Sequence, residues 1–320
     1  MGTFLFRLIQ KSKFFSSEQI KLEDKFKNIK SKYILQKIFD NLETKRKLNL
    51  IKLNKNIKER LDININDYNE YFETEIEVKP IKRDYGSNFI NIENEDDKKY
   101  VHIYLDNDKE ETQRYYINAN EEIKTIKIII DYSFKSFRRL FQYCNMNRSI
   151  NFKKCNRNDI NAMSYMFHGC YSLKELNFNN FNTSNVTDMG GMFSDCDSLE
   201  ELNLKNFNTN NVTDMSYMFS NCSSLKELNL DNFNTNNVTR MKGMFLNCYS
   251  LEELNLKNFN TNNVYTMESM FFNCKLLKEL NFNSLNTIHA NVSNMFFDCH
   301  NLIGKIKMKY KNIGKEAFNY

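Results

Sequence analysis

Two consecutive stretches decide the fold because they are nearly identical: residues 170–195 read CYSLKELNFNNFNTSNVTDMGGMFSD, and residues 196–221 read CDSLEELNLKNFNTNNVTDMSYMFSN. One cysteine opens each copy, and further copies precede and follow at a spacing of 26 residues, shortened to 25 for the last. These cysteines are Cys144, Cys170, Cys196, Cys222, Cys248, Cys274 and Cys299. Self-similarity at this period is typical of a solenoid, in which each unit buries its apolar face only by stacking on its neighbours.

The apolar pattern changes along one unit, which we number from its cysteine as position 1. Residues 202–204, Leu-Asn-Leu, alternate with period two, as a short half-buried strand does. The Asn-rich residues 206–211 favour turns, because Asn bonds nearby backbone and tolerates left-handed conformations. Met215, Met218 and Phe219 stand at i, i+3 and i+4, the inward face of about one helical turn. We therefore expect each coil to run through a strand, a turn, a short extended piece and a helical turn.

The phrase LxxLxLxxFNTxNVTxMxxMFxxC resembles the BspA-like leucine-rich repeats, in particular the variety with this repeat length found in bacterial lipoproteins. The resemblance covers roughly residues 123–310. It implies a leucine-rich-repeat-like solenoid used in binding or adhesion, without a catalytic motif. The expected fold class is α+β, with short parallel strands and helical turns stacked after a small β-rich cap and an N-terminal helical module.

Three parts are expected along the chain: a helical module in residues 1–75, a β-rich capping segment in 76–122, and the solenoid with its C-terminal cap in 123–320. Pro80, the only proline, lies where the helical pattern stops and favours a boundary there. Residues 123–128 match the strand of the repeat, which predicts an atypical first coil. After Cys299, lysines alternate with apolar residues up to Lys311, which predicts a last strand protected from edge-to-edge pairing.

Apolar residues at helical spacing predict helices between residues 17 and 72. This pattern is similar to an F-box, the helical module that docks on a ubiquitin-ligase adaptor. The resemblance implies docking through Ile34, Leu35, Ile38, Phe39 and Leu42. Such stripes are also what a helical core needs, and both interpretations stay open. The excess of Lys and Arg lies in the same segment, where lysines that solvate amphipathic helices explain it without a nucleic-acid partner.

The cysteines form a ladder, because seven of the eight hold position 1 and only Cys155 does not. A buried free cysteine behaves as a small hydrophobe, so we interpret the ladder as reduced packing residues in a reducing compartment. Rungs about 5 Å apart are just within the Cα reach of a disulfide, so oxidised pairs are the alternative. The sequence has no C-x-x-C pair and no clustered His beside the ladder, so we expect no metal site.

The candidate binding face follows from the strand of each coil, where positions 6 and 8 point outward because positions 7 and 9 are apolar. Its residues are Glu175, Asn177, Glu201, Asn203, Glu227, Asn229, Glu253, Asn255, Glu279 and Asn281. Stacked like charges repel by roughly a few tenths of a kcal/mol each. Two explanations of how this repulsion is offset stay open: lysines at positions 5 and 10 neutralise the column, or a basic partner lies along it. The identity of the residues in a column also follows from duplication of the unit alone. We further expect hydrogen-bond ladders from Asn at position 8 and Thr at position 14.

Catalysis is not expected, because the chain lacks a phosphate-binding Gly loop and an HExxH motif, and its four His are scattered. We therefore predict a non-catalytic protein–protein interaction scaffold without cofactor, a monomer with a protein partner and without nucleic acid. No apolar run approaches the length of a membrane span, and the first residues make a poor secretory signal, which favours a cytoplasmic protein over an organelle presequence or export. The alternative functions are an F-box-like substrate adaptor of a ubiquitin ligase and a surface adhesin.

Overall fold

The computed structural model describes Leu35, Gln36, Phe39, residues 59–61, and residues 73–318 except 132, 135, 156, 158, 180, 283–284 and 310–312. The chain divides into two compact units, Met1–Tyr71 and Phe72–Tyr320. In the first unit the described residues are helical, and Leu35, Phe39 and Leu61 are buried. The rest of the predicted helical module lies outside the described residues, and so do Ile34, Ile38 and Leu42 of the expected docking set.

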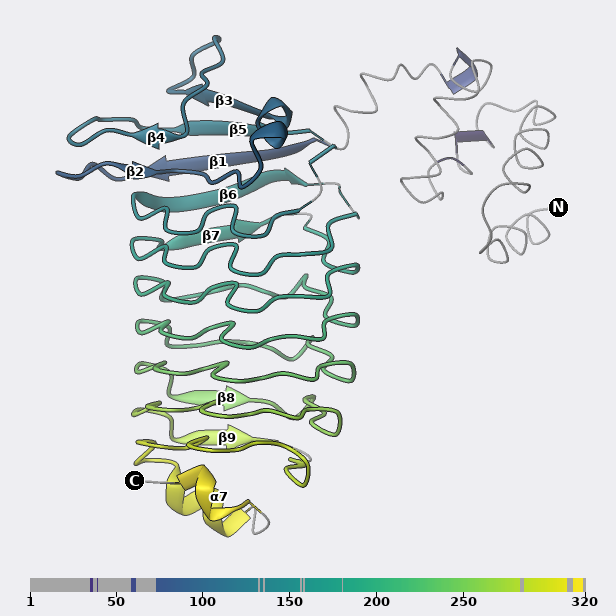
Figure 1. Ribbon diagram of the computed structural model, residues 1–320, viewed down its shortest axis with the longest axis vertical. Helices are drawn as coiled ribbons and strands as arrows, with labels where there is room; N and C mark the ends of the chain where they lie inside the picture. Colours follow the sequence, from purple (N-terminus) through teal and green to yellow (C-terminus); the bar gives the residue numbers. More distant parts are fainter. Residues whose placement is uncertain are drawn as a thin grey trace. The chain divides into compact units, whose positions relative to one another are not determined.

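The second unit is a stack of coils, one for each copy of the repeat (Figure 1). Strand β6 (Asn147–Cys155) pairs in parallel with β7 (Glu175–Phe178), and β8 (Glu253–Asn255) pairs in parallel with β9 (Glu279–Asn281). The intervening coils are joined by single parallel bridges. Each pairing sets a residue beside its equivalent in the next coil, because the repeat length keeps every position in register.

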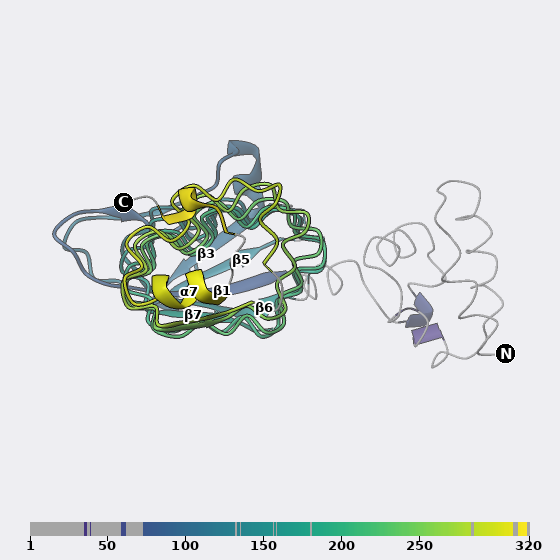
Figure 2. The ribbon, with the colours of Figure 1, turned by 90° about the horizontal axis from the view of Figure 1, so that it is seen from below.

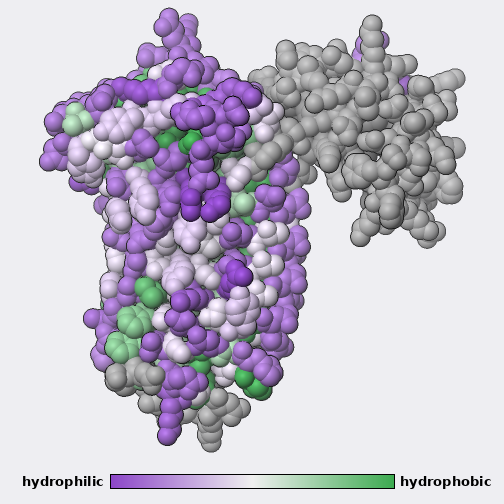
Figure 3. All heavy atoms as spheres, in the orientation of Figure 1, coloured by the Kyte–Doolittle hydropathy of each residue, from purple (hydrophilic) through white to green (hydrophobic). Residues whose placement is uncertain are grey.

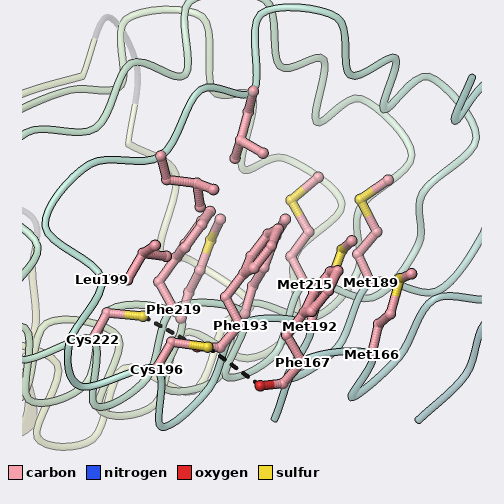
Figure 4. Packing of buried hydrophobic residues seen from close by; sticks show 14 of the residues in the cluster. Met166, Phe167, Met189, Met192, Phe193, Cys196, Leu199, Met215, Phe219 and Cys222 are labelled. Carbon is pink, nitrogen blue, oxygen red and sulfur yellow. Dashed lines mark hydrogen bonds between the residues drawn. The ribbon is translucent and has the colours of Figure 1, made fainter. Parts of the chain in front are cut away.

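The core of the stack consists of columns of identical side chains (Figure 4). Phenylalanines at position 24, from Phe141 to Phe296, stack with ring centroids 5.4 to 5.7 Å apart. The cysteines of position 1 and the methionines of positions 20 and 23 are likewise completely buried. Stacking therefore buries the apolar face that a single unit could not bury alone.

The expected helical turn is wrong, because the structure has two consecutive β-turns at this place. In one coil Met218 N–H donates to the Met215 carbonyl at 3.3 Å, and Cys222 N–H donates to the Phe219 carbonyl at 3.1 Å. The third residue of each turn has positive φ, 57° at Tyr217 and 59° at Asn221. Alternate N–H groups donate to the next coil, as Phe219 does to the Met244 carbonyl at 2.9 Å, so hydrogen bonds between coils replace those of a helix. The fold is thus mostly β with a few short helices, rather than α+β.

The N-terminal end of the stack is an antiparallel addition to the parallel strands. The sheet has the order β3-β5-β1-β6-β7, in which β1 (Thr74–Pro80) pairs antiparallel with both β5 (Ile126–Ile130) and β6. Strand β3 (Val101–Leu105) covers the outer side of β5. The first parallel strand is therefore β6, and residues 123–128 do not begin a coil, because β1 lies between them and the stack.

The remaining elements of this end lie between β1 and β5 in the chain. Strands β2 (Ser87–Asn88) and β4 (Tyr116–Ile117) pair antiparallel as a separate two-stranded ribbon. A 3-10 helix, η1 (Glu95–Tyr100), precedes β3 and is capped by Asn94, whose side chain accepts from Asp96 N–H. Together they attach to the first coil, where Asn91 N–H donates to the Leu140 carbonyl at 2.7 Å.

The C-terminal end is closed by helices, so the predicted last strand is wrong. Helix α7 (Ile303–Lys309) lies across the end of the coils (Figure 2), and its Ile306 is 2% exposed. The 3-10 helix η2 (Lys315–Phe318) follows, and Phe318 continues the phenylalanine column on Phe296, with centroids 5.6 Å apart. A helix buries its apolar residues over the final rung and satisfies its own backbone, whereas a strand there would expose a new edge.

Candidate functional site

The predicted binding face lies on the surface of the coils, as its residues were expected to do. Parallel pairing sets Glu253 beside Glu279 and Asn255 beside Asn281, and a single bridge sets Glu201 beside Glu227. The side chains of positions 6 and 8 are exposed, apart from the partly buried Asn281, while the leucines between them are buried, apart from the partly buried Leu176. The sequence thus placed these two columns on one outward face.

The charges next to this face pair differently from the expectation. Position 5 alternates in sign along the stack: Lys174, Glu200, Lys226, Glu252, Lys278. Lys226 binds Glu200 at 3.0 Å, and Lys278 binds Glu252 at 2.6 Å, so these lysines neutralise their own column. The hydrogen bond from Lys226 lowers the pKa of the Glu200 carboxyl. In the described part of the chain, no cationic nitrogen lies within 4.0 Å of the glutamates at position 6.

Three adjoining hollows of 510 to 620 Å³ follow the same face along the stack. The first is lined by Glu175 and Glu201, the second by Glu201 and Glu227, and the third by Glu227, Glu253 and Glu279. Each also includes the asparagines of position 8 from the same coils. The ten predicted residues thus line three neighbouring hollows, which share Glu201, Asn203, Glu227 and Asn229.

The asparagines of position 8 do not form the expected ladder along the stack. Three of their oxygens accept from backbone two residues later in the same coil, as Asn229 does from Asp231 N–H at 2.9 Å and Asn203 from Lys205 N–H at 3.2 Å. Such local bonds close a turn, which is a common role of Asn. Asn255 also donates to Asp231 Oδ1 of the coil before at 2.9 Å. Among the described contacts, the side-chain nitrogens of Asn203 and Asn229 have no acceptor, so they are available to a ligand.

The threonine ladder at position 14 is confirmed. Thr209 is fully buried, donates to the Asn234 carbonyl at 2.9 Å and accepts from Asn234 N–H at 2.8 Å. The same pair of bonds joins Thr183, Thr235 and Thr261 to their following coils. These residues satisfy turn backbone inside the stack and present no group to a ligand.

The cysteine ladder is structural. All eight cysteines are free and buried, and the thiols of six donate to the phenylalanine carbonyl of the coil before, as Cys196 does to Phe167 at 3.3 Å (Figure 4). Burial raises the pKa of Cys170 and Cys248 to about 12. A thiolate nucleophile or metal ligand is therefore disfavoured at these positions. Within the described residues, no three His, Cys, Asp or Glu side chains come together as metal ligands.

A polar cluster around His168 was missed by the sequence reasoning. Nδ1 of His168 lies 2.6 Å from Ser194 Oγ and 3.0 Å from Asp195 Oδ2, and Nε2 lies 2.9 Å from Tyr143 Oη. The hydrogen bond from His168 lowers the pKa of the Asp195 carboxyl. In a catalytic triad the serine and the carboxylate bind opposite nitrogens of the ring, whereas here both face Nδ1. The arrangement therefore differs from that of a catalytic triad.

A second ladder at position 26 extends this cluster down the stack. Asn221 donates to Asp195 Oδ1 at 2.6 Å, Asn247 to Asn221 at 2.7 Å, and Asn273 to Asn247 at 3.0 Å. Its last acceptor, Oδ1 of Asn273, is buried without a hydrogen-bond partner. The Asn that precedes Cys222, Cys248 and Cys274 was the available signal, but the exposure and bonding of that position depend on the turn geometry.

Comparison with known proteins supports the repeat character of the second unit. The family model described as Mycoplasma protein of unknown function, DUF285, matches residues 135–229 and again residues 203–310. The two matches overlap, as expected where one model fits successive copies of a repeat. No curated protein and no solved structure matches the chain. No helix among the described residues has both the length and the apolar character required to cross a membrane.

Proposed function

This chain belongs to the DUF285 family, and we propose that it is a non-catalytic scaffold that binds a protein partner along the exposed strand face of its solenoid. One observation carries the proposal. The glutamates of position 6 stand in register and exposed, and in the described part of the chain none of them forms an ion pair within 4.0 Å, because the neighbouring lysines of position 5 bind the glutamates of their own column.

A basic, extended partner fits this face best. Carboxylates at the roughly 4.8 Å spacing of strands repel one another, and a row of lysines or arginines laid along them removes that cost. The side-chain amides of Asn203 and Asn229, whose oxygens accept from backbone, add free hydrogen-bond donors next to the charges. The described surface drawn in Figure 3 is mostly hydrophilic. Along the strand face the exposed groups are carboxylates and amides, so charge and hydrogen bonding would select the partner.

Charge reversal on the full chain tests this function. The double variant Glu227→Lys, Glu253→Lys should reduce the recovery of a specific partner from a lysate by about tenfold or more, and binding by the unmodified chain should weaken steeply with salt. The double variant Glu110→Lys, Glu122→Lys is the charge-matched control, because both glutamates are exposed outside this face. Recovery that is equal for all three proteins would refute the strand face as the interaction surface.

We also propose that the coils are BspA-like leucine-rich repeats, on the basis of their residue phrase and parallel stacking. An F-box-like adaptor is the second candidate function, favoured by the helical, buried Leu35 and Phe39, which stand one helical turn apart. Affinity capture with the full chain and with residues 72–320 distinguishes it, because β1 begins at Thr74 and must be kept. A ligase adaptor recovered with the full chain alone supports this candidate, and its absence from both removes it.

A further inference from the structure

A separate hollow of about 590 Å³ lies at the N-terminal end of the solenoid, away from the strand face. It is formed by the segment after β2, by η1, by the residue before β4 and by the first coil. Its walls include Ile92, Lys98, Tyr115, Arg139, Gln142 and Tyr143. This volume falls within the range of about 300–1,000 Å³ that is usual for small-molecule sites.

The charges around this hollow are already compensated. Nη1 of Arg139 binds Glu93 at 2.9 Å, and Nζ of Lys98 binds Glu95 at 2.7 Å. The same Lys98 ammonium lies 5.2 Å from the centre of the Tyr115 ring. An anionic or cationic ligand would have to compete with these pairs, so the hollow favours a neutral ligand.

The walls of the hollow are also held in place. Tyr143 is 52% exposed, yet its hydroxyl is fixed by Nε2 of His168 at 2.9 Å. The side chain of Asn91 donates to the backbone carbonyl of Gln142, which joins the loop to the coil. The side-chain amide of Gln142 has no partner among the described residues, and it can donate and accept at once. An oriented aromatic ring and a free amide thus stand side by side in the chain and line one hollow.

The repeat does not require these residues. Arg139, Gln142 and Tyr143 hold positions 22, 25 and 26 of the first coil, where a later coil has Gly191, Ser194 and Asp195. The later coil forms the same turns with these smaller side chains. Two of the three have contacts of their own: Tyr143 packs against Gly169 and His168, and Arg139 binds Glu93 and lies over the Tyr165 ring. Neither the turn nor a side-chain hydrogen bond to a described residue explains Gln142.

We propose that this hollow binds a neutral saccharide. A pyranose ring has a flat face of C–H groups that suits a tyrosine ring, and a rim of hydroxyls that suits an amide and compensated ion pairs, which donate and accept without net charge. Tyr143 provides the exposed aromatic surface, and Gln142, with the Arg139–Glu93 pair, provides the polar contacts. The hollow and the strand face share no residue, so the saccharide proposal and the protein-partner proposal can be refuted separately.

Binding of neutral trisaccharides to the full chain tests the proposal. Maltotriose, cellotriose and triacetylchitotriose are titrated at up to millimolar concentration, with saturation-transfer NMR and calorimetry as readouts. At least one should bind, with an affinity that salt leaves unchanged, and Tyr143→Ser and Gln142→Ala should each weaken it by about tenfold. Tyr249→Ser is the matched control, because Tyr249 is an exposed tyrosine of a distant coil.

Three results would overturn the proposal. One is that none of the trisaccharides binds to the unmodified chain. Another is that binding survives both substitutions in the hollow. The third is that Tyr249→Ser weakens binding as much as Tyr143→Ser. The Gln142 side chain forms no hydrogen bond with a described residue, so Gln142→Ala should keep the melting temperature of the unmodified chain. A loss of binding at an unchanged melting temperature is then a loss of the site and not of the fold.

Discussion

Position 1 and position 6 of each coil lie five residues apart, and both repeat one residue type along the stack. The cysteines of position 1 are fully buried, and each of six donates its thiol proton to a carbonyl of the coil before. The glutamates of position 6 are exposed and lack an ion pair within the described part of the chain. Packing explains the first column, because a larger or smaller side chain would disturb the interior. Packing does not explain the second, whose members repel one another.

The largest expected effect comes from titration of the interior thiols. Their pKa is raised by burial, to about 12 for Cys170 and Cys248, whereas an unfolded cysteine ionises at about 8.5. The stability contributed by the neutral thiol is thus complete below about pH 8.5 and is lost as pH rises toward 12, by about 1.4 kcal/mol per pH unit for each such thiol. Chemical denaturation as a function of pH measures this slope. Cys248→Ala should make it shallower, and an identical slope in this variant would contradict the explanation.

Removal of one ring from the interior should have the next largest effect. Phe219 lies 5.6 Å from the rings of both Phe193 and Phe245, so Phe219→Ala opens a cavity and should lower the free energy of unfolding by about 3–5 kcal/mol. Phe272→Ala is the control, because Phe272 stacks on Phe297 at the half-exposed surface. Urea denaturation compares them. If both variants lost the same free energy of unfolding, buried and half-exposed columns would contribute equally to stability, against the contrast drawn above.

A smaller effect is expected at the end of the position 26 ladder. Asn273 Oδ1 is buried without a partner, and the residue of the next coil at this position, Asp298, is a carboxylate without a proton to donate. Asp298→Asn supplies an amide donor and should raise the free energy of unfolding by about 1 kcal/mol. The exposed ion pairs with Lys275 and His300 that it removes contribute little. A lower melting temperature for the variant would show that those pairs outweigh the new hydrogen bond.

The smallest change in stability is expected on the strand face itself. Glu227→Gln with Glu253→Gln removes like charges without altering shape, and it should change the free energy of unfolding by less than about 0.5 kcal/mol, in the stabilising direction. Partner recovery by the same variant should fall together with that of the charge-reversed one. A clear loss of stability would assign these glutamates to the fold and leave the partner hypothesis without its support.

The interior could be predicted in detail, because repetition shows which positions must be apolar. Cys222, Met218 and Phe219 all point inward as their spacing indicates. The backbone between them could not be predicted, since the spacing i, i+3, i+4 faces one side both in a helix and in two consecutive β-turns. Hydrogen bonds to a neighbouring coil decide between these, and a single unit does not contain them. The same limit applies to residues 303–309, where alternation predicted a strand and closure of the stack required a helix.

The sequence by itself determined the period, the parallel register and the columns that face inward or outward, because these follow from residue identity at fixed spacing. Only the tertiary structure decided which charges meet. Lys226 stands next to Glu227 in the chain, yet its ammonium binds Glu200 of the coil before at 3.0 Å. An ion pair depends on the distance between side chains of stacked coils, and that distance is set by the turns and caps that position one coil on the next.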